Sequence, residues 1–453
     1  MQAPTLGQTV APQAQRSAPR HAIHLQYLET CGPVPEARDA CWQGREDAVS
    51  AKSSLLLDIQ ILRAFAILTV LFCHLSLTAT VLQQLPGALL PPLWVGVELF
   101  FVISGFIVTK TVCEGSMAAL PFAIRRAFRL WPAMFFFVGL SGIAAYLAYA
   151  LMPDNLFAKQ SLIVSPRKFA SEELSVLFGY FINRNGSSFY MNGAMWSLSV
   201  EFQFYAVFFV LLVMLALGEF SAKTKKSAIL IVAIAVYAIS LWHRATIATG
   251  GLLGDVPRFV PYLTSFKFDF MALGVLGYFI SISRLKLPAY GPALTALALA
   301  ASLVIATVCE HPLTGGPKPW LDGWGLTVMG WSFLLAVLLA SRGDAFRGRD
   351  TVWYRFFTWV GDRSYSIYLL HYPIMALIWI GLVRLYPAAF ASEMSYGLIQ
   401  ATLVIVLSFA LADFSYRHIE LPGSRLARRV IVAIGWDEPR RASVPDATSV
   451  PHA

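Results

Sequence analysis

The sequence predicts an all-α protein, a polytopic transmembrane helix bundle of about ten spans with both termini cytoplasmic. Two observations lead to this fold class. Of its 453 residues, 57% are hydrophobic and only 13% are charged, whereas a soluble domain usually has about a quarter of its residues charged. The mean hydropathy is +0.62, and apolar stretches long enough to cross a bilayer recur along the chain.

The expected spans share a length of about 17 to 25 residues and an apolar composition. In order, they lie at about 55–78, 92–112, 129–151, 196–217, 227–243, 261–282, 288–309, 321–341, 364–386 and 396–416. We expect residues 1–54 to form a disordered or loosely ordered tail, because they lack a long apolar core and are rich in polar residues. The transmembrane domain then covers 55–425, and 426–453 form a cytoplasmic tail.

The formal charge of +9 agrees with a membrane protein whose basic residues gather in cytoplasmic loops. We expect the bilayer, and no nucleic acid, as a partner, because no basic domain with interleaved aromatic residues occurs. The five cysteines form no pattern with histidines typical of a zinc site, so no metal is expected. With the N-terminus inside, the arginines near position 125 face the cytoplasm and the loop before 92 lies outside.

The first span contains two ionisable residues, Arg63 and His74. They are eleven positions apart, about three helical turns, so they share one face and lie about 16 Å apart along the axis. Charged or titratable groups at bilayer depth usually mark a substrate path or a reaction centre. This stripe is the first candidate for chemistry.

The predicted topology places Glu98 and Glu201 at the outer level of His74. A histidine beside a carboxylate is suited to general-base catalysis, so these three residues are the candidate catalytic group. Two alternatives remain open. His74 could be a structural histidine bonded to a neighbouring helix, and either glutamate could pair with Lys267, which lies near Asp269 at the same level.

On the cytoplasmic side, the stretch FAIRRAFRLWP places Arg125, Arg126 and Arg129 at the entrance to the third span. Such a cluster is typical of a cytoplasmic anchor. Arginine side chains also suit phosphate groups, and Arg63, inside a span, is not explained as an anchor. The four arginines together could hold a phosphorylated donor.

Two further groups of residues bear on how the helices pack and on a polar cavity expected between them. Gly105, Gly274 and Gly277 favour close helix packing, with Ser104 as a hydrogen-bonding residue between helices. The run GDRSYSIYLLHYP carries Asp362, Ser364, Tyr365, Tyr368 and His371. Its polar residues form either a second wall of the same cavity or structural hydrogen bonds between helices.

Six segments, in order, resemble the acyltransferase-3 family of integral membrane enzymes: DIQILRAFAILTVLFCH, GVELFFVISGF, FAIRRAFRLWP, WSLSVEFQFY, GDRSYSIYLLHYP and HIELPGSRL. The resemblance covers roughly residues 55–425. It implies that Arg63 and His74 correspond to the family's arginine and histidine of the first span. It also implies matches at Glu98, at the arginine cluster, and at Trp196 and Glu201. The closing segment, with Glu420 and Pro422, departs from the family pattern, and we expect it to pack against the inner face.

The resemblance implies a membrane O-acyltransferase in the bacterial inner (cell) membrane. Such enzymes acylate hydroxyl groups of glycans or glycolipids, including lipopolysaccharide and other polysaccharides, or of small molecules such as macrolides. Acyl-CoA, expected to be acetyl-CoA, would be the donor, held by Arg63, Arg125, Arg126 and Arg129. His74 would act as general base or as acyl carrier, supported by Glu98 or Glu201. Some relatives add an extracytoplasmic domain; here we expect the membrane domain to act alone or with a separate partner.

The candidate substrate-binding residues are Trp196, Tyr205, Lys267 and Asp269. Two functions from other classes stay open at this point: a proton-coupled transporter or flippase that uses His74, Glu98 and Glu201 as a proton relay, and a non-catalytic membrane scaffold.

Overall fold

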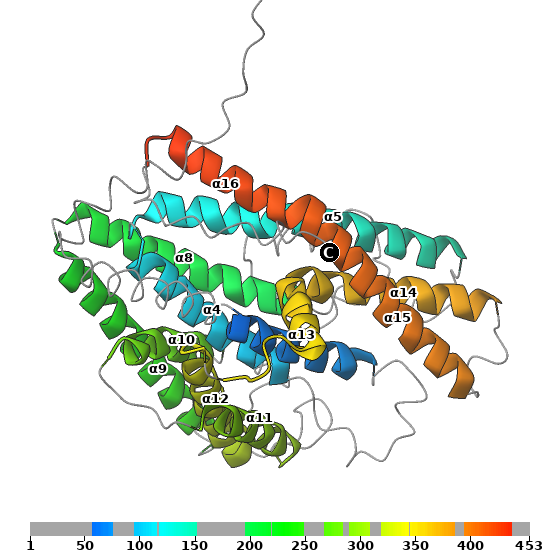
Figure 1. The fold of residues 1–453 in the computed structure, drawn as a ribbon, viewed down its shortest axis with the longest axis horizontal. Helices are drawn as coiled ribbons and strands as arrows, with labels where there is room; N and C mark the ends of the chain where they lie inside the picture. The colour runs from blue at the N-terminus through cyan, green and yellow to red at the C-terminus, as the bar shows by residue number, and fades with distance from the viewer. Residues whose placement is uncertain are drawn as a thin grey trace, which may run out of the picture. The chain divides into compact units, whose positions relative to one another are not determined.

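The fold is a bundle of α-helices, seen in a computed structural model (Figure 1). The structure describes residues 57–75, 95–115, 117–151, 195–218, 220–248, 267–283, 290–308, 319–343, 345–385 and 394–436. The first described helix is Leu57–Leu75. The remaining elements are α4 (Gly96–Cys113), α5 (Ala119–Leu151), α8 (Met195–Leu217), α9 (Ala222–Ala248), α10 (Phe268–Ser281), α11 (Gly291–Val308), α12 (Pro319–Ala340), α13 (Val352–Asp362), α14 (Ser364–Leu385), α15 (Met394–Ser415), η5 (Tyr416–Glu420) and α16 (Leu421–Ala433).

The prediction of an all-α membrane protein is confirmed. Six helices of the described part are long and apolar enough to cross a membrane, and α10 and parts of α11 and α12 form shorter apolar helices. Each of the ten expected spans contains a helix. The number of crossings and the cytoplasmic location of the termini remain predictions, since 1–56 and 437–453 lie outside the described residues.

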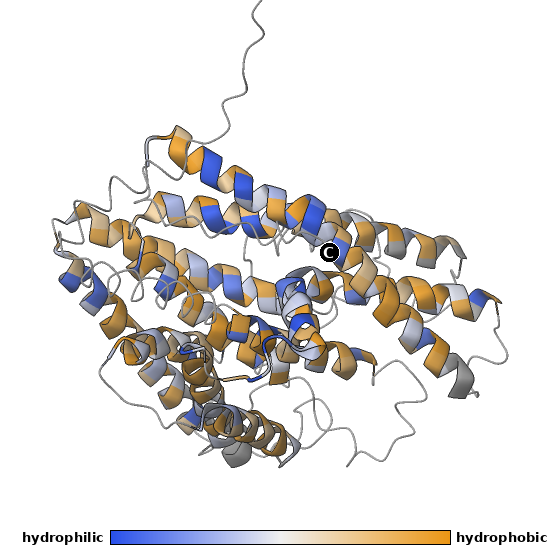
Figure 2. Ribbon diagram, in the orientation of Figure 1, coloured by the Kyte–Doolittle hydropathy of each residue, from blue (hydrophilic) through white to orange (hydrophobic). Residues whose placement is uncertain are grey.

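Two helices differ from the expected limits. The helix α5 begins at Ala119, ten residues before the expected span, so the whole arginine cluster is helical. The helix α16 runs across the predicted boundary at 425, because Gly423 and Ala427 are buried and Gly423 meets the backbone of Phe128 on α5. Polar residues are prominent on α16 and on the adjacent half of α5, whereas α4 and α8 are mostly hydrophobic (Figure 2).

The helices α4 and α10 approach each other closely through glycine, as predicted. A Cβ atom built on Gly105 would lie 2.0 Å from the carbonyl oxygen of Met271, and one built on Gly274 would lie 2.1 Å from that of Val102. Small residues allow such backbone contact between membrane helices. The contact fixes the position of α4, which carries Glu98 and Ser104.

The amphipathic helix α13 is joined to the first described helix by polar contacts. The Asp58 carboxylate accepts hydrogen bonds from the Tyr354 hydroxyl at 2.7 Å and from the Ala345 backbone amide at 2.9 Å. Burial, and next the bond to Asp58, raise the pKa of Tyr354 well above its usual range, so the hydroxyl stays a donor. Gly361 meets the backbone of Gln60, and α13 then ends at Asp362, where α14 begins two residues later.

A pair of glycine substitutions tests the α4–α10 contact. We expect Gly105→Ala to lower the free energy of unfolding by about 1–3 kcal/mol, because the new methyl group meets backbone that must shift. The measurement is thermal unfolding of the purified protein in detergent. Gly139→Ala on α5 is the matched control, since nothing lies within 4 Å of its added Cβ; it should be neutral or stabilising. Equal melting temperatures for the two variants would contradict the close contact.

Candidate active site

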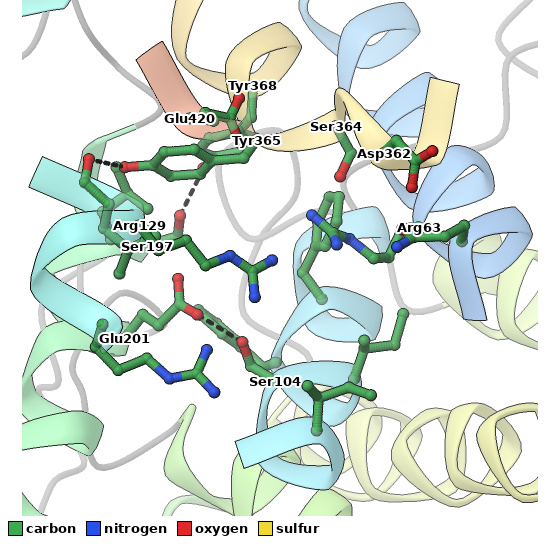
Figure 3. A pocket seen from close by; sticks show the side chains of 18 of the residues that line it. Arg63, Ser104, Arg129, Ser197, Glu201, Asp362, Ser364, Tyr365, Tyr368 and Glu420 are labelled. Atoms are coloured by element: carbon green, nitrogen blue, oxygen red, sulfur yellow. Dashed lines mark hydrogen bonds between the residues drawn. The ribbon is translucent and has the colours of Figure 1, made fainter. Parts of the chain in front are cut away.

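A cavity of about 360 Å³ lies between the first described helix, α4, α5, α8, the α13–α14 corner and η5. It has charged and hydroxyl groups on several sides (Figure 3). The polar lining consists of Gln60, Arg63, Ser104, Arg126, Arg129, Ser197, Glu201, Tyr205, Asp362, Ser364, Tyr365, Tyr368, Tyr416, Glu420 and Ser424. A cavity that combines apolar walls with converging polar groups is the usual form of a small-molecule site.

Three of the four arginines in the predicted donor group line this cavity. Arg126 and Arg129 are one turn apart on α5, and Arg63 enters from the first described helix. Figure 3 shows the Arg63 and Arg129 side chains extending toward the same space from different helices. The Arg126 guanidinium lies 5.2 Å from the ring centre of Tyr205, an arrangement that holds the cation in place. Arg125 is not among the lining residues.

Glu201 lines the same cavity as the three arginines. Its Oε1 atom accepts a hydrogen bond from the Ser104 hydroxyl of α4 at 2.5 Å and a second from the Tyr205 hydroxyl of α8. Glu201 and Tyr205 are four residues apart, so they share a face of α8. The predicted substrate-binding residue Tyr205 therefore lines the same cavity as the predicted catalytic residue Glu201.

The α13–α14 corner and η5 complete the wall. The Tyr365 hydroxyl donates to the backbone carbonyl of Leu130 at 2.9 Å, and the Tyr368 and Ser197 hydroxyl groups are 2.6 Å apart. The residues of the GDRSYSIYLLHYP run therefore fulfil both interpretations in part, since several of them line the cavity and some also form hydrogen bonds to neighbouring helices. Glu420 was expected to pack against the inner face. It lies in the cavity wall, where the Ser366 hydroxyl donates to it, because a π-helical turn interrupts the α-helix at this point.

Within the described residues, His74 is hydrogen-bonded to a second histidine. Its Nδ1 atom lies 2.9 Å from Nε2 of His371 on α14, and the two rings are close to parallel, 19° apart. Tyr372 packs edge-on against His74 with ring centres 4.7 Å apart. His74 is not among the cavity-lining residues. Tyr368 connects the two regions, because it lines the cavity and its ring centre lies 5.9 Å from that of His371.

The outer layer that was expected to unite His74, Glu98 and Glu201 is divided in the structure. Glu98 accepts a hydrogen bond from the Lys267 ammonium, so the ion-pair alternative holds for Glu98 and not for Glu201. The physical reason is that depth in the bilayer does not determine which side of a helix faces which neighbour.

A second buried ion pair lies beside the first. Asp269 pairs with Arg244 of α9, with 2.6 Å between Oδ2 and Nη2. Lys267 also lies 5.6 Å from the ring centre of Trp196. Of the predicted substrate-binding residues, Trp196, Lys267 and Asp269 therefore belong to this group of ion pairs. The part played by Arg244 was missed, although its place at the end of an apolar stretch was a signal.

Comparison with known proteins supplies the family. Residues 56–417 match the family described as the acyltransferase domain, which is most of the chain. The chain belongs to the acyltransferase-3 family. It is similar to the O-acetyltransferase OatA of Staphylococcus aureus, with 24% identity over 80% of this chain and 56% of the relative. It is also similar to the peptidoglycan O-acetyltransferase OatA of Listeria monocytogenes, with 25% identity over 80% of this chain and 54% of the relative.

The chain thus spans about half the length of these relatives of the acyltransferase-3 family. No solved structure matches it. Family membership and the six apolar helices together make it a multi-pass membrane protein.

A double-mutant cycle tests whether Glu98 and Lys267 act as a structural pair. Glu98→Leu and Lys267→Met should each lower the free energy of unfolding by about 3–5 kcal/mol, because each leaves one buried charge without its partner. The double variant should recover much of this loss. Thermal unfolding of the four proteins gives the coupling energy. Two losses that simply add in the double variant would show that the pair does not stabilise the bundle.

Proposed function

We propose that this chain is an integral membrane O-acyltransferase that transfers an acyl group, expected to be acetyl, from acyl-CoA to a hydroxyl of a cell-surface or exported glycan. The observation that carries the proposal is the convergence of Arg63, Arg126 and Arg129 with Glu201 in one cavity inside the helix bundle. The names of the two relatives, an O-acetyltransferase and a peptidoglycan O-acetyltransferase, support acetyl as the group transferred and, for the Listeria protein, a glycan as acceptor.

The three arginines would bind the phosphate groups of the donor. Planar guanidinium groups bind phosphate oxygens with two parallel hydrogen bonds. A purely anchoring role for the cluster is less well supported, because an anchor needs its charges in the cytoplasm or among lipid headgroups, and Arg126 and Arg129 line a cavity. Arg125, outside the lining, fits the anchoring role better.

The separation of Arg63 and His74 suits this donor. The two residues lie about 16 Å apart along their helix, comparable to the length of a pantetheine arm. With its nucleotide at the arginines, acyl-CoA could extend along the helix until its thioester reaches His74. Tyr368 lines the cavity, and its ring centre lies 5.9 Å from that of His371, the hydrogen-bond partner of His74.

His74 would remove the proton from the acceptor hydroxyl. The oxygen then bonds to the thioester carbonyl carbon, the carbon–sulfur bond breaks, and the proton passes from His74 to the departing thiolate. As the alternative, a His74 nitrogen attacks the thioester carbonyl carbon, the carbon–sulfur bond breaks and CoA leaves as the thiolate. The acyl group then passes from His74 to the hydroxyl oxygen, and the hydroxyl proton goes to the freed imidazole and from there to the thiolate. Glu201 would hold Ser104, Tyr205 and the arginines in position. The layer formed by Glu98, Lys267, Asp269 and Trp196 would lie next to the bound acceptor.

Loss of the His74 imidazole is the first test. His74→Ala should reduce acyl transfer by at least about 100-fold, the contribution typical of general-base catalysis, while the affinity for CoA stays unchanged. The measurements are release of CoA thiol in the presence of a glycan acceptor and CoA binding by calorimetry in nanodiscs. Full transfer by the variant would exclude the catalytic role. Solute movement without acyl chemistry in the native protein would favour a transporter.

Removal of one donor-binding arginine is the second test. Arg126→Ala should raise the KM for acyl-CoA about 10- to 100-fold, because a hydrogen bond to a charged group contributes about 1.5–3 kcal/mol. Its kcat should change little. Arg428→Ala is the matched control, since Arg428 is exposed on α16 and outside the cavity lining. An equal KM for both variants would contradict the donor site.

A further inference from the structure

The contact between His74 and His371 determines which nitrogen of each ring carries the proton. Nδ1 of His371 lies 3.1 Å from the backbone carbonyl oxygen of Ile367. A carbonyl only accepts hydrogen bonds, so the proton of His371 is on Nδ1. Its Nε2 therefore presents a lone pair to Nδ1 of His74, 2.9 Å away, and His74 must donate.

We infer that His371 is a positioning residue that holds His74 in the tautomer protonated on Nδ1, so that Nε2 of His74 is the atom with the reactive lone pair. The inference rests on the proposed function for the identity of the reaction. It assigns the reacting nitrogen and its supporting residue, which family membership alone does not provide. As base, Nε2 takes the hydroxyl proton while the carbon–oxygen bond forms, and returns it to the thiolate when the carbon–sulfur bond breaks.

Burial separates the roles of the two histidines. His371 has 0% of its surface exposed, so it does not touch a substrate, whereas His74 is only partly buried. The nearly parallel rings keep the donor and acceptor nitrogens in line, and Tyr372 packs edge-on against both rings. His74 thus has a fixed orientation as well as a fixed tautomer.

A neutral imidazole suits this place better than a carboxylate. In Ser-His-Asp enzymes, an aspartate accepts the Nδ1 proton of the histidine and stabilises the imidazolium. An unpaired carboxylate at bilayer depth costs several kcal/mol. His371 accepts the same proton without a buried negative charge, and the hydrogen bond persists when Nε2 of His74 is protonated. The two glutamates expected in this role are bonded elsewhere, Glu98 to Lys267 and Glu201 to Ser104 and Tyr205.

The tautomer can be observed directly by nitrogen NMR of the protein in nanodiscs, labelled with ¹⁵N at both histidine ring nitrogens. His74→Gln identifies the His74 signals. In the native protein we expect a protonated Nδ1 and an unprotonated Nε2 at His74. His371→Gln should keep this pattern, because its amide oxygen can accept the same proton. His371→Leu removes the acceptor, and His74 should shift toward the Nε2-protonated tautomer that a solvent-exposed histidine side chain favours in water.

Kinetics give the second readout. His371→Leu should lower kcat about 100-fold with an unchanged KM for acyl-CoA, because the arginines of the cavity are untouched. His371→Gln should restore most of the rate. His418→Gln, the same substitution at an exposed histidine, is the control and should leave kcat unchanged.

The outcomes separate this inference from the proposed function. An Nε2-protonated His74 in the native protein would overturn the inference even if transfer is observed. So would a His371→Gln variant that is folded and bears the native His74 tautomer but is as slow as His371→Leu. If no acyl transfer is detected in the native protein, the proposed function fails, and the NMR result still decides the tautomer.

Discussion

The cost of charge inside a bilayer is the constraint on which the rest of the structure depends. A charged or strongly polar group at that depth needs a partner within the protein. At one level of the bundle the need is met by compact ion pairs, Glu98 with Lys267 and Asp269 with Arg244. Around the cavity, arginines and carboxylates face an open space instead. Arg63, Arg126 and Arg129 are there with Glu201.

Helix packing determines which charged groups form buried ion pairs and which line the cavity. The glycine contact between α4 and α10 brings Glu98 beside Lys267 and leaves Ser104, six residues later on α4, to bond Glu201 of α8. The π-helical turn after α15 has a comparable effect at the other wall, where it places Glu420 in the lining. Small backbone features thus divide similar residues between a layer of buried ion pairs and the lining of a cavity.

Much of this was accessible from the sequence. Hydrophobic stretches predicted a helix in each expected span. The cost of an arginine inside a span singled out Arg63 as a candidate functional residue, and it lines the cavity. The partners were less predictable. Topology gave Glu98, Glu201 and His74 a common depth, but the rotation of each helix depends on contacts distant in sequence. The His74–His371 bond joins residues 297 positions apart, and the π-helical turn at Glu420 has no simple sequence pattern.

The most direct measurement is a cryo-electron microscopy structure of the full chain in nanodiscs with a non-hydrolysable acetyl-CoA analogue. The proposed site predicts density for the donor's phosphates against Arg63, Arg126 and Arg129, and the acyl end of the arm beside Nε2 of His74. Density for the donor at any other surface, with this cavity empty, would contradict it.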